Sequence, residues 1–293
     1  MLSAFIMLLS VTPAFSAVIA DHTSTDLSVI PDYWITKVKT DLHVVYNHTS
    51  HGSQLITGLN ALESFPDYGS RYAWQNASLG NDTSLSLYDE GIPGAVDLSE
   101  GDNDSDGDGV ADWAEDTYNF LVNTENYHFN VVMWSWCSIG GHNISLYLDS
   151  MEWLIENFSS GGSHERAETH PVHFVFMTAH ANGGGEGDSA DAPNEQIRAH
   201  VIANDRILFD FSDIENYDPD GNYFLDKFLD DALYYDSDNN QSRDANWASE
   251  YLARHDNGEL DRLTLGENVD GYNGCDECAH SPDPGETQDA KLN

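Results

Sequence analysis

The sequence predicts an α/β protein with a three-layer, doubly wound parallel sheet, and three observations lead to this prediction. Apolar runs of strand length alternate along the chain with segments whose apolar residues recur at helical spacing. The strand runs are almost continuously apolar, which is typical of parallel strands covered by helices on both faces. The chain has 293 residues, of which 40% are hydrophobic and 11% aromatic, so it can bury a sizeable core.

The first predicted strand and helix are joined by a polar turn. Residues 42–46 form a short apolar, β-prone run, and a histidine- and serine-rich stretch over residues 47–54 follows it. Apolar residues at Leu55, Ile56 and Leu59 then recur at helical spacing, which predicts a helix that starts at the Ser/Gly turn. Strand, turn and helix in this order form the first unit of the predicted sheet.

Three more apolar runs complete the predicted sheet. Strands are expected over residues 130–136, 173–178 and 206–211, and helices over residues 143–157 and about 192–204. Because the strands alternate with helices, each strand is expected to run parallel to its neighbours.

Two stretches are acidic and rich in turns. We interpret residues 63–117 as an insertion that leaves the main fold. Residues 212–293 have the same character, apart from one amphipathic piece around 222–233.

The N-terminus resembles a secretory signal peptide over residues 1–20. Residues 2–11 are apolar, too few to span a membrane, and followed by small residues, although no Lys or Arg precedes them. Cleavage is expected after Ser16, Ala17 or Ala20. We therefore expect an exported protein, extracellular or at the cell surface, with one α/β domain over residues 21–293.

The charge of the chain is strongly negative. The sequence has 11 Lys+Arg against 51 Asp+Glu and a formal net charge of −40. Such a polyanion repels phosphate backbones and anionic lipid headgroups, so nucleic-acid binding and a basic membrane-binding patch are excluded. The excess of acid favours a halophilic source, in which salt screens the self-repulsion. The alternative is a surface protein whose acids bind calcium.

An acidic loop over residues 104–115 has the spacing of an EF-hand calcium loop. Asp occupies positions 1, 3, 5 and 9 of the twelve-residue pattern, Gly109 position 6 and Glu115 position 12. The predicted ligands are Asp104, Asp106, Asp108, Asp112 and Glu115, with the carbonyl oxygen of Val110. The loop also resembles those of dockerin and thrombospondin type 3 repeats, and we expect Ca²⁺ to stabilise it. A second acidic loop from Asp236 lacks the glycine and the last acid and is discounted.

The three cysteines are Cys137, Cys275 and Cys278. One disulfide and one remaining thiol is the simplest arrangement for an exported chain, and no second cysteine pair completes a zinc site. Their pairing is left open.

A serine and a histidine far apart in the sequence have the pattern of a hydrolase site. Ser50 follows the first predicted strand, where a hydroxyl lies at the carboxyl edge of a parallel sheet. His280 offers a general base, and Glu277 or Asp276 precedes it as an orienting acid.

These features resemble the SGNH (GDSL-like) hydrolase superfamily, in particular a branch with a His-x-Ser-x-Gly turn, here from His48 to Gly52. The resemblance implies a flavodoxin-like three-layer architecture. It also implies Ser50 as nucleophile, His280 as base and Glu277 as orienting acid, with the amides of Ser50 and Gly52 as oxyanion donors. The family's Gly-x-Asn-Asp block is missing after the second strand, so Asn143 and Asn182 are candidates for the remaining oxyanion donor.

Other interpretations of the same residues stay open. A serine at the start of a helix is commonly an N-cap, and Ser53 is a competing nucleophile that we expect inside the helix. His48, His51 and His180 lie at predicted strand ends, so with His280 they also suit a transition-metal site. Trp134 and Trp136 alternate along one strand and are expected to pack under a helix.

The sequence thus predicts a secreted, calcium-stabilised serine hydrolase that acts on small-molecule esters or acylated glycans or lipids. A non-catalytic calcium-binding surface or adhesion protein is the alternative. A metal-dependent hydrolase is the third possibility. The oligomeric state is left open.

Overall fold

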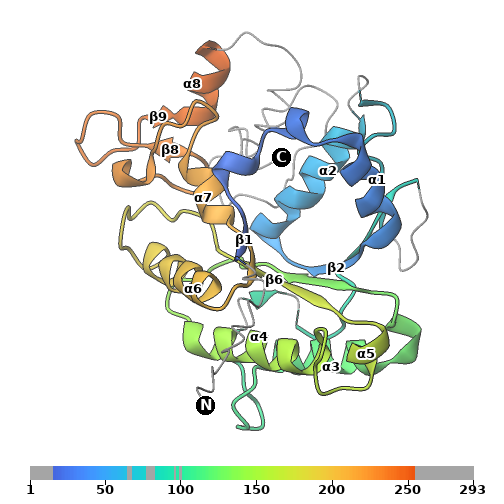
Figure 1. Cartoon of the computed structure of the whole chain (residues 1–293). Coiled ribbons are helices and arrows are strands. Elements are labelled where there is room, and N and C mark those ends of the chain that lie inside the picture. The colour runs from blue at the N-terminus through green and yellow to red at the C-terminus, as the bar shows by residue number, and fades with distance from the viewer. Residues whose placement is uncertain (1–15, 65–67, 77–82, 96, 99–100, 255–293) are drawn as a thin grey trace, which may run out of the picture.

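A seven-stranded, all-parallel sheet forms the centre of the molecule (Figure 1). The computed structural model describes residues 16–64, 68–76, 83–95, 97–98 and 101–254. The strands are β1 (Val18–Ala20), β2 (His43–Asn47), β3 (Trp74–Asn76), β4 (Leu85–Asp89), β5 (Val131–Trp134), β6 (His173–Met177) and β7 (Ile207–Phe209). Their order across the sheet is β1-β7-β6-β5-β2-β4-β3, so the chain winds in both directions from β2.

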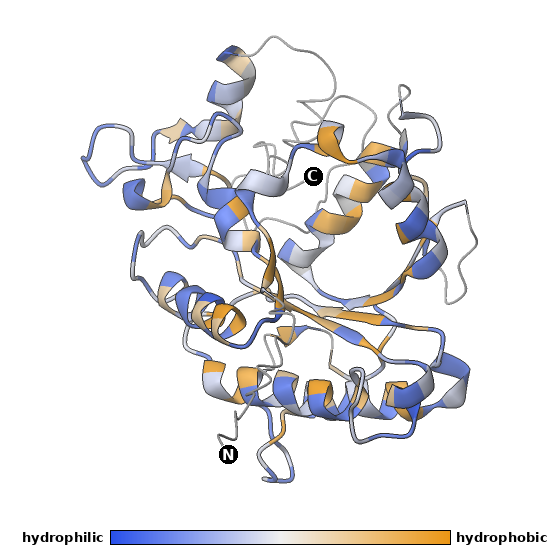
Figure 2. Cartoon of the chain, in the orientation of Figure 1, coloured by the Kyte–Doolittle hydropathy of each residue, from blue (hydrophilic) through white to orange (hydrophobic). Residues whose placement is uncertain are grey.

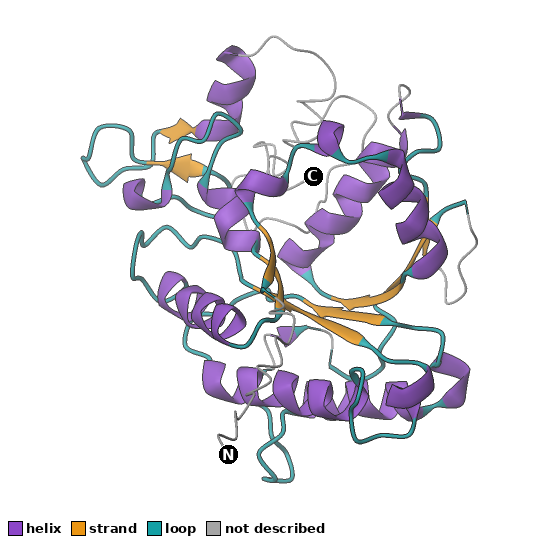
Figure 3. Ribbon diagram, viewed as in Figure 1, coloured by secondary structure: helices purple, strands orange, loops and turns teal. Residues whose placement is uncertain are grey.

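Helices cover both faces of this sheet (Figure 3). One face carries α1 (Asp32–Asp41) and α2 (Ser53–Ser64), and the other carries α3 (Asp112–Val122), α4 (Ile144–Phe158), α5 (Arg166–Thr169) and α6 (Asp191–Ala203). The predicted α/β class with a helix-covered parallel sheet is therefore confirmed.

The period-two pattern of the strands divides the core between the two faces. On β2, Val45 packs with the helices α3, α4 and α6, whereas Val44 and Tyr46 pack with α2 and Phe211. Trp134 and Trp136 are 1% and 2% exposed and belong to the larger cluster, as expected from their alternation. Figure 2 shows the strands in largely hydrophobic colours between helices of mixed character.

A smaller unit follows the sheet. It contains α7 (Phe211–Asn216), the 3-10 helix η7 (Leu225–Lys227), a two-stranded antiparallel ribbon and α8 (Trp247–Arg254). The ribbon strands are β8 (Tyr234–Tyr235) and β9 (Ala245–Asn246), and Phe224, Leu229 and Trp247 belong to its own apolar cluster. No helix within the described part of the chain is both long and apolar enough for a bilayer crossing.

The interpretation of residues 63–117 as an insertion is wrong. This segment contributes β3 and β4 to the sheet, and β4 pairs with the central strand β2. Its last residues begin α3, where Trp113 and Ala114 are fully buried. In the connection between β4 and α3, Ile92, Ala95 and Leu98 also belong to the larger apolar cluster.

The predicted leader boundary at residue 20 also conflicts with the sheet. Residues 18–20 form β1, which pairs in parallel with β7 from Val18 opposite Ile207 to Ala20 opposite Phe209. Cleavage after Ala20 removes this strand, whereas cleavage after Ser16 or Ala17 leaves it in place.

Candidate functional site

The candidate site lies at the carboxyl edge of the sheet, where connections leave β2 and β5 toward opposite faces. The chain after β2 enters the 3-10 helix η3 (Ser50–Gly52) and then α2, and the chain after β5 leads to α4. Such a reversal of winding direction is the place where open α/β sheets bind ligands.

His48 connects a serine to an aspartate at this edge. Its Nε2 atom lies 2.6 Å from Asp89 Oδ1, at the end of β4, and its Nδ1 atom lies 3.2 Å from Ser53 Oγ, at the start of α2. The ring is 4% exposed and stacks on Tyr46 at 4.6 Å. Because Asp89 accepts the Nε2 hydrogen, Nδ1 is left to accept the Ser53 hydroxyl hydrogen. This is the order of a nucleophile, a base and an orienting acid.

Gly52 lies in tight packing between these groups. A Cβ atom at this position would lie 2.2 Å from Ser135 Oγ, 2.4 Å from His48 Cβ and 2.8 Å from Tyr46 Oη. The Gly52 amide donates to the Thr49 carbonyl at 2.8 Å, so it is not directed at a reacting oxyanion. The Gly52 amide is thus engaged within the turn and the residue serves its packing, while the oxyanion role expected for it stays a prediction.

The other predicted catalytic residues have mixed outcomes. Ser50 opens η3, but its side chain lies outside the described part of the structure, as do all atoms of Glu277 and His280. Asn182 is exposed in the loop after β6. Asn143 caps α4 by accepting the Leu146 amide at 3.3 Å, which gives it a structural role in place of the expected oxyanion contact.

Two of the strand-end histidines meet in a second cluster. The rings of His51 and His180 stack at 3.8 Å, and His51 Nε2 lies 2.9 Å from Asp231 Oδ2. His180 bonds to the carbonyl oxygens of Cys137 and Ala181 at 2.8 and 2.6 Å. One ligand atom from each of His51, His180 and Asp231 lies within 4.8 Å of the others. Binding of a metal here requires one His180 nitrogen to give up its hydrogen bond to a carbonyl oxygen, because a nitrogen that donates has no lone pair for the metal.

The predicted histidine set is thus divided. His51 and His180 come together, whereas His48 belongs to the Asp89 and Ser53 group. His280 lies outside the described residues.

The loop over residues 104–115 brings its acids together. Ligand oxygens of Asp104, Asp106 and Asp108 lie within 4.8 Å of one another. Burial raises the pKa of Glu115, and the negative charges of Asp106 and Asp108 raise it further. The carboxylate of the last predicted ligand therefore interacts electrostatically with the other acids of the loop. The helix α3 begins at Asp112, the ninth position. The donor set fits a hard cation that takes oxygen ligands.

The discounted loop from Asp236 repeats part of this geometry. In both loops the amide at position 6 donates to the acid at position 1, from Gly109 to Asp104 at 3.1 Å and from Gln241 to Asp236 at 2.7 Å. Gln241 has a φ of 72°, close to the 92° of Gly109. Position 12 is Trp247, which is 4% exposed and offers no oxygen ligand.

No family model, curated protein or solved structure matches the chain. The functional assignment therefore depends on the geometry of the site.

Sequence reasoning missed Asp89 and Asp231. Asp89 lies 41 residues after His48, in the segment interpreted as an insertion, and Asp231 lies 180 residues after His51. One signal was present, because Asp89 follows the short apolar run of β4 and so ends a strand beside β2. Asp231 is one of many acids in an acidic region and has no such signal.

Proposed function

We propose that the chain is a serine hydrolase of carboxylic esters whose nucleophile lies in the turn over residues 50–53. The series Ser53, His48 and Asp89 carries this proposal. When the Ser53 hydroxyl attacks the ester carbonyl, its proton passes to His48 Nδ1, and Asp89 stabilises the resulting imidazolium. His48 then gives that proton to the departing alcohol, and water hydrolyses the acyl-serine by the same route.

The position of Ser53 supports this chemistry. It is the first residue of α2, so the amides of the first helical turn and the positive end of the helix dipole lie beside its hydroxyl. These groups favour the negative charge that develops on the carbonyl oxygen. Burial of His48 at 4% exposure keeps water from competing for its hydrogen bonds.

Ser50 with His280 and Glu277 is the competing assignment, from the resemblance to SGNH hydrolases. The strand order supports that resemblance, since β4-β2-β5-β6-β7 corresponds to the flavodoxin-like order 2-1-3-4-5. Both assignments place the nucleophile in the same turn, but they differ in the serine, in the base and in the orienting acid.

Labelling identifies the nucleophile directly. The full chain is treated with a fluorophosphonate, and fragmentation of the modified peptide locates the label on Ser50 or Ser53. Hydrolysis of p-nitrophenyl acetate is measured for Ser50→Ala, Ser53→Ala, His48→Gln and His280→Gln, with exposed Ser249→Ala as control.

The expected result is a label on Ser53, with loss of about 10²–10⁴-fold in kcat/KM for Ser53→Ala and His48→Gln. A label on Ser50, with losses confined to Ser50→Ala and His280→Gln, assigns the nucleophile to Ser50 and supports the set of Ser50, His280 and Glu277. If neither serine is labelled and every variant hydrolyses at the wild-type rate, the hydrolase proposal is wrong. A non-catalytic calcium-binding surface protein is then the better account.

A metal-dependent hydrolase is the second candidate function, and the cluster of His51, His180 and Asp231 favours it. Two imidazoles and one carboxylate are ligands typical of Zn²⁺ and Fe²⁺ sites. Elemental analysis of the purified protein tests this. Near one equivalent of transition metal, lost in Asp231→Asn together with hydrolysis, supports it, and metal-free protein with full hydrolysis contradicts it.

We also propose Ca²⁺ as a structural ion of the loop over residues 104–115 and export as the location of the protein. Bound Ca²⁺ neutralises the carboxylates of Asp104, Asp106 and Asp108, which otherwise repel one another. The ion takes no part in the ester chemistry.

A further inference from the structure

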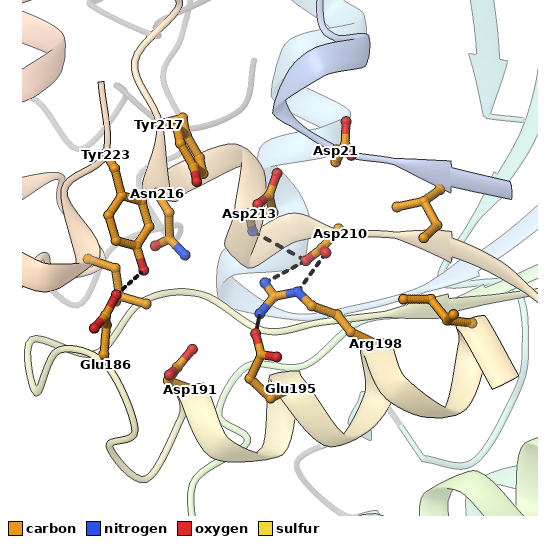
Figure 4. Close-up of a pocket in the computed structure, with 13 residues that line it drawn as sticks. Asp21, Glu186, Asp191, Glu195, Arg198, Asp210, Asp213, Asn216, Tyr217 and Tyr223 are labelled. Carbon is orange, nitrogen blue, oxygen red and sulfur yellow. Dashed lines mark hydrogen bonds and ion pairs between the residues drawn. The ribbon is translucent and has the colours of Figure 1, made fainter. Parts of the chain in front are cut away.

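A pocket of about 410 Å³ opens beside the edge strand β1, at the end of the sheet away from the His48 turn. Its walls come from the ends of β1 and β7, from α6 and α7 and from the segment after α7 (Figure 4). None of the lining residues belongs to the groups of His48 or His51. We call it the β1–β7 pocket.

The lining of the β1–β7 pocket is strongly acidic. Its carboxylates outnumber its single guanidinium six to one, and they are Asp21, Glu186, Asp191, Glu195, Asp210 and Asp213. The guanidinium of Arg198 is already engaged. It donates to Asp210 through Nε at 2.7 Å and through Nη2 at 2.8 Å, and to Glu195 through Nη1 at 2.6 Å.

A buried acceptor faces the same space. Asn216 is 3% exposed, and its Nδ2 atom donates to Ser212 Oγ at 3.3 Å. Its Oδ1 atom is buried without a hydrogen-bond partner among the described residues. Figure 4 shows the Asn216 amide directed into the space bordered by Glu186, Asp191 and Tyr223. A buried carbonyl oxygen requires a donor, and carboxylates cannot supply one at neutral pH.

Two tyrosines form one wall of the pocket. The rings of Tyr217 and Tyr223 lie 5.0 Å apart, and the Tyr223 hydroxyl donates to Glu186 Oε1 at 3.0 Å. The His22 ring stacks on one face of Tyr217 at 3.7 Å, so a cation can contact Tyr223 or the other face of Tyr217. Tyrosine faces attract cations, and organic cations more than hydrated metal ions use such walls.

The distances between the acids of the pocket favour an organic cation with separate N–H groups over a single metal ion. Among the described residues, only Asp21, His22 and Asp213 place ligand atoms here within 4.8 Å of one another, and Glu186, Asp191 and Glu195 do not join them. Acids spread over the walls suit a ligand with several N–H donors at separate points better than a single ion.

We propose that the β1–β7 pocket binds a small organic dication of the diamine class. One ammonium group donates to Asn216 Oδ1 and to the carboxylates of Asp191 and Glu186, against the tyrosine wall. The other lies toward Asp21 and toward the carboxylate of Asp213, which already accepts from the His22 amide at 3.0 Å. A free diamine is favoured over a lysine side chain because acids line the pocket on both sides.

Isothermal titration of the full chain at fixed ionic strength tests this proposal, with putrescine as probe. The expected result is one saturable site per chain, with binding of 1,4-butanediol, the neutral isostere, weaker by about 100-fold or more. N-acetyl-lysine amide, which carries one ammonium, is expected to bind about tenfold or more weakly. Tighter binding of the lysine amide than of putrescine overturns the choice of a free diamine.

Variants separate the pocket from the diffuse charge of the molecule. Glu186→Gln with Asp191→Asn should weaken putrescine binding about tenfold or more, whereas the exposed pair Glu125→Gln with Glu168→Gln, which changes the net charge equally, should not. Asn216→Asp adds an acceptor charge and should tighten binding, and Tyr223→Phe, which releases Glu186, should weaken it.

Two outcomes overturn the proposal. One is equal weakening in both charge-matched pairs, which shows attraction to the net charge alone. The other is failure of putrescine to bind, and a stoichiometric transition metal that is lost in His22→Ala then identifies a metal as the ligand. Ser53→Ala is expected to bind putrescine normally, so failure of this proposal is distinguishable from failure of the proposed hydrolase.

Discussion

At the scale of single residues, the turn after β2 is defined by what fits around Gly52. Tyr46 and Ser135 approach its Cα from neighbouring strand ends, and the Tyr46 hydroxyl donates to the Gly52 carbonyl at 3.0 Å. The glycine thus lets η3 pack directly against the strands, and that close approach places His48 between Asp89 and Ser53. The resemblance to SGNH hydrolases implies a catalytic amide at Gly52, but a sequence pattern does not show which amides are already bonded.

Gly52→Ala tests this packing. The added methyl group has to displace Ser135 Oγ and His48 Cβ, which lie within 2.4 Å of it, so we expect a loss of about 1–3 kcal/mol in the free energy of unfolding. Urea denaturation measures this loss, and ester hydrolysis should fall as His48 moves. Ser53→Ala, at the next position, is the control, because it should reduce hydrolysis with little change in the urea midpoint. An unchanged midpoint for Gly52→Ala contradicts the packing described here.

At the scale of elements, Glu152 joins three parts of the α4–α6 layer. Its carboxylate accepts from Arg206 Nε at 2.8 Å, just before β7, and lies 2.8 Å from His200 Nε2 on α6. Burial alone raises the pKa of Glu152, but the hydrogen bonds and charges of Arg206 and His200 outweigh it, so the pKa lies below its ordinary value. The ionised form is therefore stabilised in the folded state.

The sign of this shift predicts a pH dependence. A carboxylate whose pKa is depressed by folding contributes its full stabilisation above the pKa of the unfolded chain, and loses it as the pH falls through the folded value. Glu152→Gln should cost about 1–2 kcal/mol at pH 7, and the difference from wild type should shrink below about pH 4. Urea midpoints measured across this range check the prediction, with exposed Asp149→Asn on the same helix as control. A difference independent of pH contradicts it.

The acidic loop over residues 104–115 is the second element with a measurable consequence. The loop leads directly into α3, whose Trp113 is fully buried, so an ion that orders the loop also stabilises the core. At about 100 times its Kd, Ca²⁺ should add about 2.7 kcal/mol and raise Tm by about 5–10 °C.

Asp108→Ala with Glu115→Ala should erase that shift in Tm, whereas Glu125→Ala with Glu168→Ala, of equal charge change, should keep it. Thermal unfolding with Ca²⁺ and with a chelator gives the comparison. A shift that survives in the loop variant places the ion elsewhere, and the loop from Asp236 is then the first place to look.

The elements that sequence reasoning predicted are those with long apolar runs. β2, β5, β6 and β7 were expected at nearly their observed positions, because each reads as a nearly continuous apolar stretch in the sequence. β1 and β3 have three residues each and lie at the sheet edges, where half-buried side chains leave little periodicity. The partnership of His48 with Asp89 was missed for a different reason: it depends on β4 lying beside β2, and β4 was assigned to the segment interpreted as an insertion.

At the scale of the whole molecule, the net charge of −40 is the dominant property. Near neutral pH the acids repel one another across a folded surface that is far smaller than that of the unfolded chain. Salt shortens the range of this repulsion, from about 10 Å at 0.1 M to about 3 Å at 1 M.

Stability should therefore rise with salt. We expect the urea midpoint to increase between about 0.1 M and 1 M NaCl in the presence of a chelator, which removes any calcium contribution. An unchanged midpoint under these conditions argues against salt adaptation. A rise that appears only with Ca²⁺ assigns the acidic composition to ion binding.

The pairing of β1 with β7 has a consequence for the order of folding. These strands meet across most of the described chain, and His22 reaches Asp213 over a separation of 191 residues. Contacts between such distant segments form late, because closing so long a loop costs entropy before the favourable free energy of the contacts offsets that cost. The strands from β2 to β6 can associate first. Until β1 pairs with it, the edge of β7 that faces away from β6 has no partner strand. The β1–β7 pocket is therefore the last part of the sheet edge to be completed, and a ribosome-bound chain that has not yet synthesised residue 213 cannot contain it.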